Sequence, residues 1–193
     1  MGADEERKAA ATMNRTGGRR GGFTLIELLV VIAIIGILAA ISMPVISKAM
    51  QSAKKAQAAT ELKTIETGLR AYYNDYSKYP HNSGLQADFT YSDLGAAPNS
   101  ELMNVLRALD GPGNNSHANN PRRIVYIELT ERQIDGERNF IDPWQRQYIV
   151  TVDTAFDNDC KGVAPHGTVL NKQVIAWSRG PEIDPQEDDI KSW

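Results

Sequence analysis

An uninterrupted apolar run near the N-terminus constrains this chain more than any other feature. Leu28–Ser47 contains 20 consecutive residues without a charged side chain. At 1.5 Å per residue, a helix of this length measures about 30 Å, the thickness of the hydrocarbon core of a bilayer. Arg19 and Arg20 precede the run, and basic residues in that place predict a cytoplasmic N-terminus. The run therefore predicts a single membrane-spanning helix.

A carboxylate at the start of this run needs an explanation. Glu27 directly precedes the uncharged residues, and a charged side chain in the hydrocarbon region is expensive. A secretory signal peptide would need a small-residue cleavage site after the run. Ala39–Ser42 fits such a site poorly, because apolar residues continue through Ile46. A plain single-span anchor is the other alternative, but it leaves Glu27 and the Gly21–Gly22 pair unexplained.

The stretch GGFTLIE at residues 21–27 resembles the cleavage and methylation motif of type IV prepilins and type II secretion pseudopilins. The resemblance implies that a membrane-embedded prepilin peptidase cuts after Gly22 on the cytoplasmic face. Phe23 then becomes the N-methylated N-terminus, and Met1–Gly22 is a discarded leader. The glycine pair agrees with cleavage, because it lets the backbone enter a protease cleft without a side-chain clash.

The same resemblance makes Glu27 the fifth residue of the mature chain. Cleavage leaves an ammonium group at Phe23, and methylation keeps its charge. A buried carboxylate is tolerated when it is paired. We therefore expect Glu27 of one subunit to meet the Phe23 ammonium of its neighbour in a helical homopolymer, which would favour assembly in register.

Gly36 and Pro44 interrupt the apolar run. A proline inside a helix removes one hydrogen bond and kinks the helix. In the resembled family a proline at this position is usual, and the segment between the glycine and the proline can lose helicity on assembly. Alternatively, Pro44 is simply a proline tolerated in a membrane helix.

Beyond Pro44 the pattern becomes amphipathic, with apolar residues at three- and four-residue spacing as far as Tyr76. We expect one long helix from Phe23 to about Tyr76. Its transmembrane and assembly half covers residues 23–47, and its amphipathic half covers residues 48–76. Residues 77–193 then form a globular head.

The head contains several short predicted elements. Residues 98–113 predict a short helix capped by Asn99 or Ser100, and Asp142–Trp144 predicts a turn. Three segments rich in β-branched and aromatic residues predict strands that pair antiparallel, because their loops are too short for crossover helices. These are Arg123–Leu129, Gln147–Val152 and Gln173–Ser178. The expected fold class is α+β and pilin-like, with the long helix packed on a small antiparallel sheet.

Two stretches of the head narrow the resemblance. DPWQRQYIV at residues 142–150 resembles the DPWGNPY turn and strand of the major pseudopilins of type II secretion. WSRGPEIDPQEDDIKSW at residues 177–193 resembles their acidic closing segment, which binds calcium. The implied Ca²⁺ ligands are Glu182, Asp184, Asp188 and Asp189, and carboxylate oxygens suit that ion. The match is imperfect, since Glu182 and Ile183 stand where the family has Asp-Gly, and a solvated acidic loop is the alternative.

Other functional classes find little support. The net charge of −3 argues against a nucleic-acid partner. His81, His117 and His166 fall in separate loop-like segments without metal-site spacing. The single cysteine, Cys160, excludes an intrachain disulfide and is either a partly buried thiol or an intermolecular or reactive group. We therefore expect no enzymatic activity.

The resemblance implies a structural subunit of a type II secretion pseudopilus, which polymerises through its N-terminal helix to drive protein export across the outer membrane. The expected partners are further copies of the chain, the prepilin peptidase and methyltransferase, minor pseudopilins and the inner-membrane assembly platform. The expected location is the bacterial inner membrane as a single-pass protein with a periplasmic head, then a periplasmic or extracellular filament. The alternatives are a type IV pilin of a surface pilus, for adhesion, twitching motility or DNA uptake, and a membrane-anchored periplasmic enzyme or binding protein.

Overall fold

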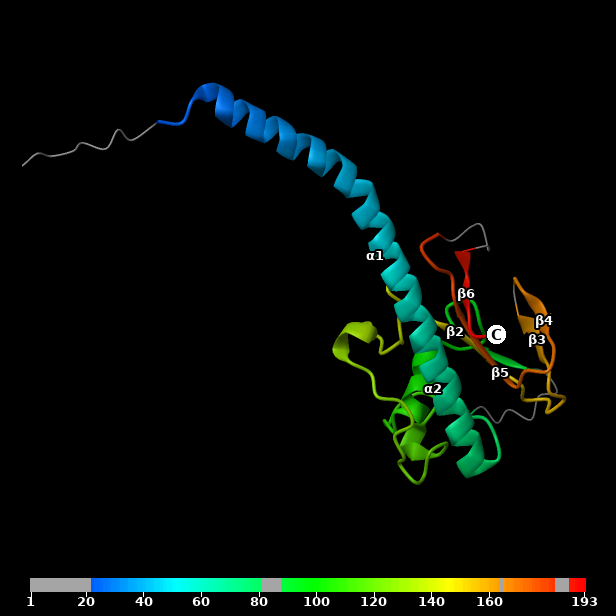
Figure 1. Ribbon diagram of the computed structural model, residues 1–193. Coiled ribbons are helices and arrows are strands. Elements are labelled where there is room, and N and C mark those ends of the chain that lie inside the picture. The colour runs from blue at the N-terminus through cyan, green and yellow to red at the C-terminus, as the bar shows by residue number, and fades with distance from the viewer. Residues whose placement is uncertain (1–21, 81–87, 164, 183–187) are drawn as a thin grey trace, which may run out of the picture. The chain divides into compact units, whose positions relative to one another are not determined.

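The computed structural model describes residues 22–80, 88–163, 165–182 and 188–193 (Figure 1). The chain divides into two compact units, one ending at Val45 and one running from Ile46 to Trp193. Apart from Gly22, the predicted leader lies outside the described residues. A long N-terminal helix and a C-terminal antiparallel sheet are both present, which confirms the expected α+β, pilin-like fold.

Helix α1 comprises Leu25–Tyr76, close to the predicted range. It remains helical from Gly36 through Pro44, and the Ser42 hydroxyl donates a hydrogen bond of 2.7 Å to the Leu38 carbonyl in this stretch. The loss of helicity on assembly that the resemblance implies therefore stays a prediction about the filament.

The part of α1 beyond Ile46 carries a buried stripe. Five apolar side chains with no exposed surface recur at three- and four-residue spacing, namely Ala58, Leu62, Ile65, Leu69 and Tyr72. They belong to the main core of the head, together with one face of the sheet. Burying a leucine of this kind stabilises a fold by about 1.5–3 kcal/mol.

The sheet has the strand order β1-β2-β5-β6, and every neighbouring pair is antiparallel. The strands are β1 (Phe89–Tyr91), β2 (Ile149–Val152), β5 (Val174–Ser178) and β6 (Ile190–Lys191). The predicted strands at 147–152 and 173–178 thus exist in slightly shorter form as β2 and β5. Figure 1 shows the sheet beside the second half of α1.

Both faces of this sheet are covered. Val150 pairs with Ala176 in register, and both belong to the core that contains α1. Ile149 pairs with Trp177, and both belong to a second cluster with Cys160 and Trp193. Cys160 lies in the hairpin of β3 (Cys160–Val163) and β4 (Gly167–Val169). Coverage on both sides explains why β2 and β5 are buried along their whole length.

Helix α2 comprises Asn99–Leu106, but the predicted side-chain cap is wrong. Pro98 occupies the N-cap position, and no side chain caps the helix. The Asn99 amide instead donates to the carbonyls of Phe140 and Tyr148, both at 2.8 Å, and accepts from the Phe140 N–H at 2.8 Å. The Asn99 side chain therefore ties the start of α2 to Phe140 and Tyr148. Its amide nitrogen and oxygen are both used in these bonds, so the side chain does not cap the helix.

The predicted strand at Arg123–Leu129 is also wrong, since this segment forms no strand. The N–H groups of Tyr126 and Ile127 both donate to the Leu106 carbonyl at the end of α2, at 2.7 and 3.3 Å. Ile127 is buried in the main core, and its side chain lies directly over Gly68 of α1. The segment thus packs on α1, and β1 takes the place beside β2.

Buried asparagine side chains organise the chain between α2 and this segment, where the short 3₁₀ helix η1 (Asn115–His117) lies. The Asn114 amide donates to the Leu109 carbonyl at 2.8 Å and accepts from the N–H groups of Asn119 and Asn120 at 3.1 Å. The Asn120 amide donates to the carbonyls of Val105 and Ile124 at 2.8 and 2.7 Å. These amides replace the regular backbone pairing that the loop lacks.

Candidate functional site

The predicted processing residues lie in exposed, non-helical backbone just before α1. Phe23 is 82% exposed, and a Cβ atom built on Gly22 would meet no atom within 4 Å. A peptidase needs an accessible, non-helical segment, and this stretch has both properties. Cleavage after Gly22 and methylation of Phe23 stay predictions.

Glu27 forms a capping box with Thr24 at the start of α1. The Thr24 N–H and hydroxyl donate to Glu27 Oε2 at 2.8 and 2.7 Å, and the Glu27 N–H donates to the Thr24 hydroxyl at 3.3 Å. This reciprocal arrangement satisfies N–H groups that a helix start otherwise leaves unpaired. The sequence analysis missed Thr24, although a threonine three residues before a glutamate is the usual signature of this motif.

The first unit displays apolar side chains on all sides of α1. Between Phe23 and Val45 the large apolar residues are 46–82% exposed, including Leu28, Ile32, Ile35 and Leu38. A helix that is apolar all round needs lipid or protein around it. By length and composition, α1 could cross a membrane. A Cβ atom at Gly36 would meet nothing within 4 Å, so this predicted assembly residue makes no close contact in the single chain.

In the head, the Asp142–Trp144 turn precedes β2 as predicted. Asp142 is buried, and its Oδ1 accepts from the N–H groups of Trp144 and Arg146, both at 2.9 Å. Its Oδ2 accepts from the Ser178 hydroxyl at 2.6 Å. The Trp144 indole N–H donates to Gln51 Oε1 of α1 at 3.2 Å. The turn therefore links the helix, β2 and the end of β5.

Arg146 connects this turn to the closing segment of the chain. Its guanidinium donates to the carbonyls of Gly180 and Pro181, at 2.8 and 3.2 Å. Gly180 has a φ of +66°, and a Cβ atom there would lie 2.4 Å from the Asp188 carbonyl oxygen. Only glycine suits that conformation and that approach. The two head segments that carry the family resemblance thus lie together in space.

The predicted calcium ligands have different surroundings. Glu182 is exposed, and Asp184 lies outside the described residues. Asp188 Oδ1 lies 2.6 Å from Lys55 Nζ, and Asp189 Oδ2 lies 2.8 Å from His166 Nε2. In the described ranges, no three His, Cys, Asp or Glu side chains gather as a metal site would require. The described carboxylates therefore do not fit one shared ion, and calcium binding stays a prediction.

His166 lies between aromatic side chains near the C-terminus. Its ring contacts those of Trp177 and Trp193, with centroids 5.6 and 5.5 Å away. Its Nε2 touches the Asp189 carboxylate outside hydrogen-bond geometry. Burial, together with the nearby Lys191 charge, lowers the pKa of His166, although Asp189 opposes this. A neutral imidazole at neutral pH follows.

A buried carboxylate of α1 binds Tyr148, the residue just before β2, and the sequence analysis missed it. Glu61 is 6% exposed and accepts hydrogen bonds from the Tyr148 hydroxyl, from Gln57 Nε2 at 3.0 Å and from Gln133 Nε2 at 2.9 Å. Gln133 belongs to the short 3₁₀ helix η2 (Glu131–Gln133). Burial, followed by the bond to Glu61, raises the pKa of Tyr148. Three donors offset the desolvation of Glu61, so the group holds three segments together.

Cys160 is fully buried and unpaired. Its Sγ lies 3.1 Å from the Lys172 carbonyl. Burial, and then the carboxylates of Asp88 and Asp153, raise the pKa of the thiol to about 12. A protonated buried thiol is a poor nucleophile, so of the two interpretations of Cys160 the structure supports the buried thiol.

Comparison with known proteins agrees with this arrangement. A model of the prokaryotic N-terminal methylation motif matches residues 18–43. The type IV major pilin protein PilA of Myxococcus xanthus is 38% identical over 86 residues, which cover 45% of this chain and 36% of the pilin. No solved structure matches.

The matches to type II secretion proteins are longer. Core protein G of the type II secretion system of Klebsiella pneumoniae is 29% identical over 177 residues, covering 91% of this chain and 95% of that protein. The Escherichia coli protein of the same name is 32% identical over 127 residues, covering 64% of this chain and 88% of its relative. With its prepilin motif, long helix and DPW turn, the chain belongs to the type II secretion system core protein G family.

Proposed function

We propose that this chain is the pseudopilin that forms the body of a type II secretion pseudopilus. The observation that carries the proposal is the exposed apolar surface of the chain between Phe23 and Val45, within and directly after the matched prepilin motif. Such a surface suits lipid before assembly and neighbouring helices after it. The subunit would polymerise through this helix, and growth of the filament would drive folded proteins across the outer membrane.

The proposed route begins in the inner membrane. The peptidase would cut between Gly22 and Phe23, and the methyltransferase would modify Phe23. Arg19 and Arg20 favour a cytoplasmic start, and the head would then lie in the periplasm. Minor pseudopilins and the inner-membrane assembly platform would then incorporate the subunit into a filament.

Glu27 would align neighbouring subunits during this assembly. Both side-chain hydrogen bonds that it accepts in the described part of the chain end on Oε2. Oε1 is thus open to the Phe23 ammonium of a second subunit. A charge pair excluded from water favours the registered over the unregistered arrangement, because an unpaired carboxylate there would be costly.

The head would act as a structural body rather than as an enzyme. Its one thiol is buried and protonated, and its described histidines lie apart in η1 and before β4. The network of Glu61, Tyr148 and Gln133 is likewise satisfied within the fold.

A type IV pilin is the second candidate, because the Myxococcus pilin is 38% identical to this chain over 86 residues. The pseudopilin is preferred because the Klebsiella relative aligns with 91% of the chain. The two functions differ in what is lost when the gene is removed, which is exported protein in one case and surface filaments in the other.

The experiment compares the culture-medium proteins of a deletion strain, its parent and a strain complemented with the wild-type gene. We expect a defined set of proteins to leave the medium and accumulate in the periplasm, and complementation to restore them. A complemented strain carrying Glu27→Ala serves as the assembly-deficient control. An unchanged set of secreted proteins, with loss of surface filaments, would instead support the pilin.

A further inference from the structure

We infer that Lys55 and His166 fasten the C-terminal residues 188–193 to the head, in place of the divalent cation that the family resemblance implies. Lys55 acts from α1 and His166 from the turn before β4. The two contacts lie on opposite faces of the sheet.

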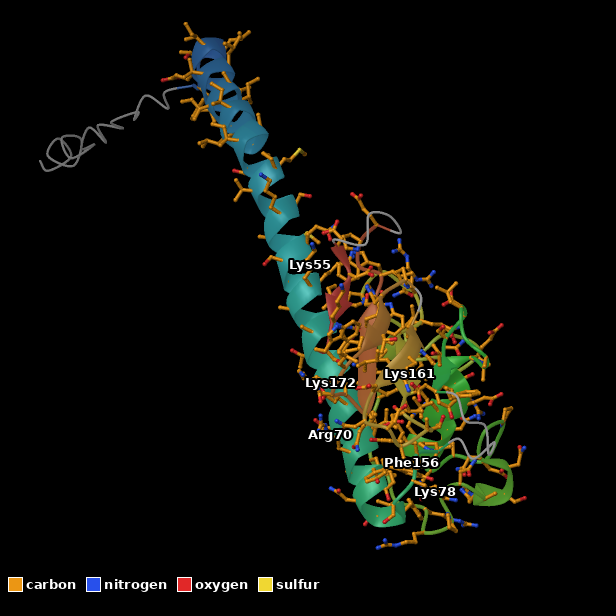
Figure 2. The ribbon with its side chains drawn as sticks, turned by 90° about the vertical axis from the view of Figure 1, so that its right-hand side faces the viewer. Lys55, Arg70, Lys78, Phe156, Lys161 and Lys172 are labelled. Atoms are coloured by element: carbon orange, nitrogen blue, oxygen red, sulfur yellow. The ribbon has the colours of Figure 1, made fainter. Side chains whose placement is uncertain are left out.

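The contact on the helix side is an ion pair. Lys55 Nζ lies 2.6 Å from Asp188 Oδ1, and both side chains are partly buried. Figure 2 shows Lys55 on α1 beside the C-terminal segment. Eight residues later, Lys63 Nζ donates to the Ser192 carbonyl at 2.7 Å. Two lysines of one helix thus hold both ends of the segment, and the first already neutralises the carboxylate that calcium would need.

The contact on the outer side is almost fully enclosed. The side chains of His166 and Asp189 are only 8% and 3% exposed, and their nearest polar atoms are 2.8 Å apart. The rings of Trp177 and Trp193 pack edge-on against the imidazole. The rings that surround His166 supply no oxygen donors, whereas calcium takes six to eight oxygen ligands.

The strand register shows why these two carboxylates point apart. Ile190 pairs with Ser178 and belongs with the helix-side core, while Lys191 pairs with Trp177, which belongs to the outer cluster. Successive side chains along a strand alternate between its faces. Just before this strand, Asp188 contacts Lys55 of α1 and Asp189 contacts His166 beside Trp177, so the two carboxylates face different partners rather than one shared ion.

The backbone on the helix side supports the same function. The Ser192 N–H donates to the Ala176 carbonyl at 3.0 Å, and the Ser192 hydroxyl accepts from the Ala176 N–H at 3.0 Å. The last residues therefore continue the pairing with β5 beyond β6. Asp188 is paired with Lys55 on the helix side and Trp193 packs against His166 on the outer side, so contacts within the chain account for how the described segment is held.

The test is thermal unfolding of the full chain in detergent, followed by tryptophan fluorescence. Wild type, Lys55→Gln, Asp188→Asn and the double variant are each measured in millimolar calcium and in EGTA. We expect the wild-type Tm to be the same in both. We expect each single variant to lower Tm by about 2–4 °C in both conditions, and the double variant to be no worse than either, since the two residues act through one contact.

Lys54→Gln is the matched control, because Lys54 is the adjacent lysine and forms no ion pair in the described ranges. It should leave Tm unchanged. A calcium-dependent rise of several degrees in the wild-type Tm would overturn the inference. Equal Tm values for Lys55→Gln and Lys54→Gln would overturn it as well.

A second measurement on the wild type does not depend on a variant that folds. Carboxypeptidase removal of Trp193, followed by mass spectrometry, reports how firmly the segment is held. The rate should be equal in calcium and EGTA, and His166→Ala should raise it equally in both. Faster removal of Trp193 from the wild type in EGTA would show that a divalent cation holds the segment, which contradicts the inference.

Discussion

Both halves of α1 carry large apolar side chains, but those side chains have opposite surroundings. Leu38 in the first unit is 60% exposed, whereas Leu62 in the second has no exposed surface. A Cβ atom at Gly36 would meet nothing within 4 Å, but one at Gly68 would lie 2.5 Å from Ile127 Cγ1. In the head the chain itself covers its apolar side chains, whereas in the first unit, under the proposed function, lipid or neighbouring subunits would cover them.

This contrast also shows two ways in which an apolar helix surface selects the surface that packs against it. The apolar stripe in the head faces one direction, so its partner is fixed by folding. The apolar surface of the first unit faces every direction, so it does not select a partner side by itself. In the proposed filament, Glu27 would be the residue that gives this unit a preferred register.

The largest expected effect follows from replacing Glu27. Glu27→Ala should leave leader cleavage intact but reduce filament yield by more than about tenfold, since a misplaced charge pair is worth several kcal/mol in a water-free setting. Sheared-filament blots and leader-cleavage assays would measure the two steps separately.

Glu27→Gln separates charge from helix capping, because glutamine can keep the capping box without the charge. We expect this variant to assemble as poorly as Glu27→Ala. Thr24→Ala, which keeps the charge and weakens the cap, should assemble nearly normally. A normal filament yield from Glu27→Gln would show that capping, and not charge, is what Glu27 provides.

The next effect compares one leucine from each half. Leu62→Ala should destabilise the head by about 2–5 kcal/mol, because it leaves a cavity in a packed core. That corresponds to a fall in Tm of about 5–15 °C. Leu38→Ala, the matched change at an exposed position, should leave the Tm of the detergent-solubilised chain unchanged and affect filament yield instead. Similar Tm losses in the two variants would erase the distinction between the halves.

A smaller effect compares the two glycines. Alanine favours a helix by about 1 kcal/mol over glycine, but at Gly68 the added methyl group would press on Ile127. We expect Gly68→Ala to lower Tm by about 2–4 °C, the shift that about 1 kcal/mol produces. Gly36→Ala should leave Tm unchanged. Thermal unfolding checks both, and a higher Tm for Gly68→Ala would mean that Ile127 moves freely.

The smallest effect is a pH dependence in the head. Burial pushes the pKa of Glu66 upward, but its hydrogen bonds and ion pairs with Lys63 and Arg70 outweigh burial and hold it below 4.5. A lowered pKa in the folded state contributes stability that is present above 4.5 and is lost as pH falls through the folded value. Urea unfolding at neutral and acidic pH should show a shallower decline for Glu66→Gln than for wild type. Identical declines would contradict the assignment.

The sequence was sufficient for the long helix and for two strands, because these have clear periodic or β-branched patterns. It failed at Arg123–Leu129, where the same alternation serves packing on α1 and no strand lies alongside. Strands β1 and β6 contain three and two residues, too few for any pattern to stand out.

The contacts within the head were harder to predict. Lys55 and Asp188 are 133 residues apart, and only the fold brings them together. Arg146 and His166 likewise act through partners that local spacing does not reveal. Thr24 is different, because its three-residue spacing to Glu27 is visible in the sequence and predicts a capping box.

The buried thiol of Cys160 allows local opening of the head to be measured. Cys160 is fully covered in the folded head and has a pKa near 12, so a thiol reagent reacts with it only after the fold opens. The labelling rate of the natural chain thus reports how often the β3–β4 hairpin opens away from the sheet face that it covers. The labelling rate of Cys160 can be compared between the filament and the free subunit without adding any probe to the protein.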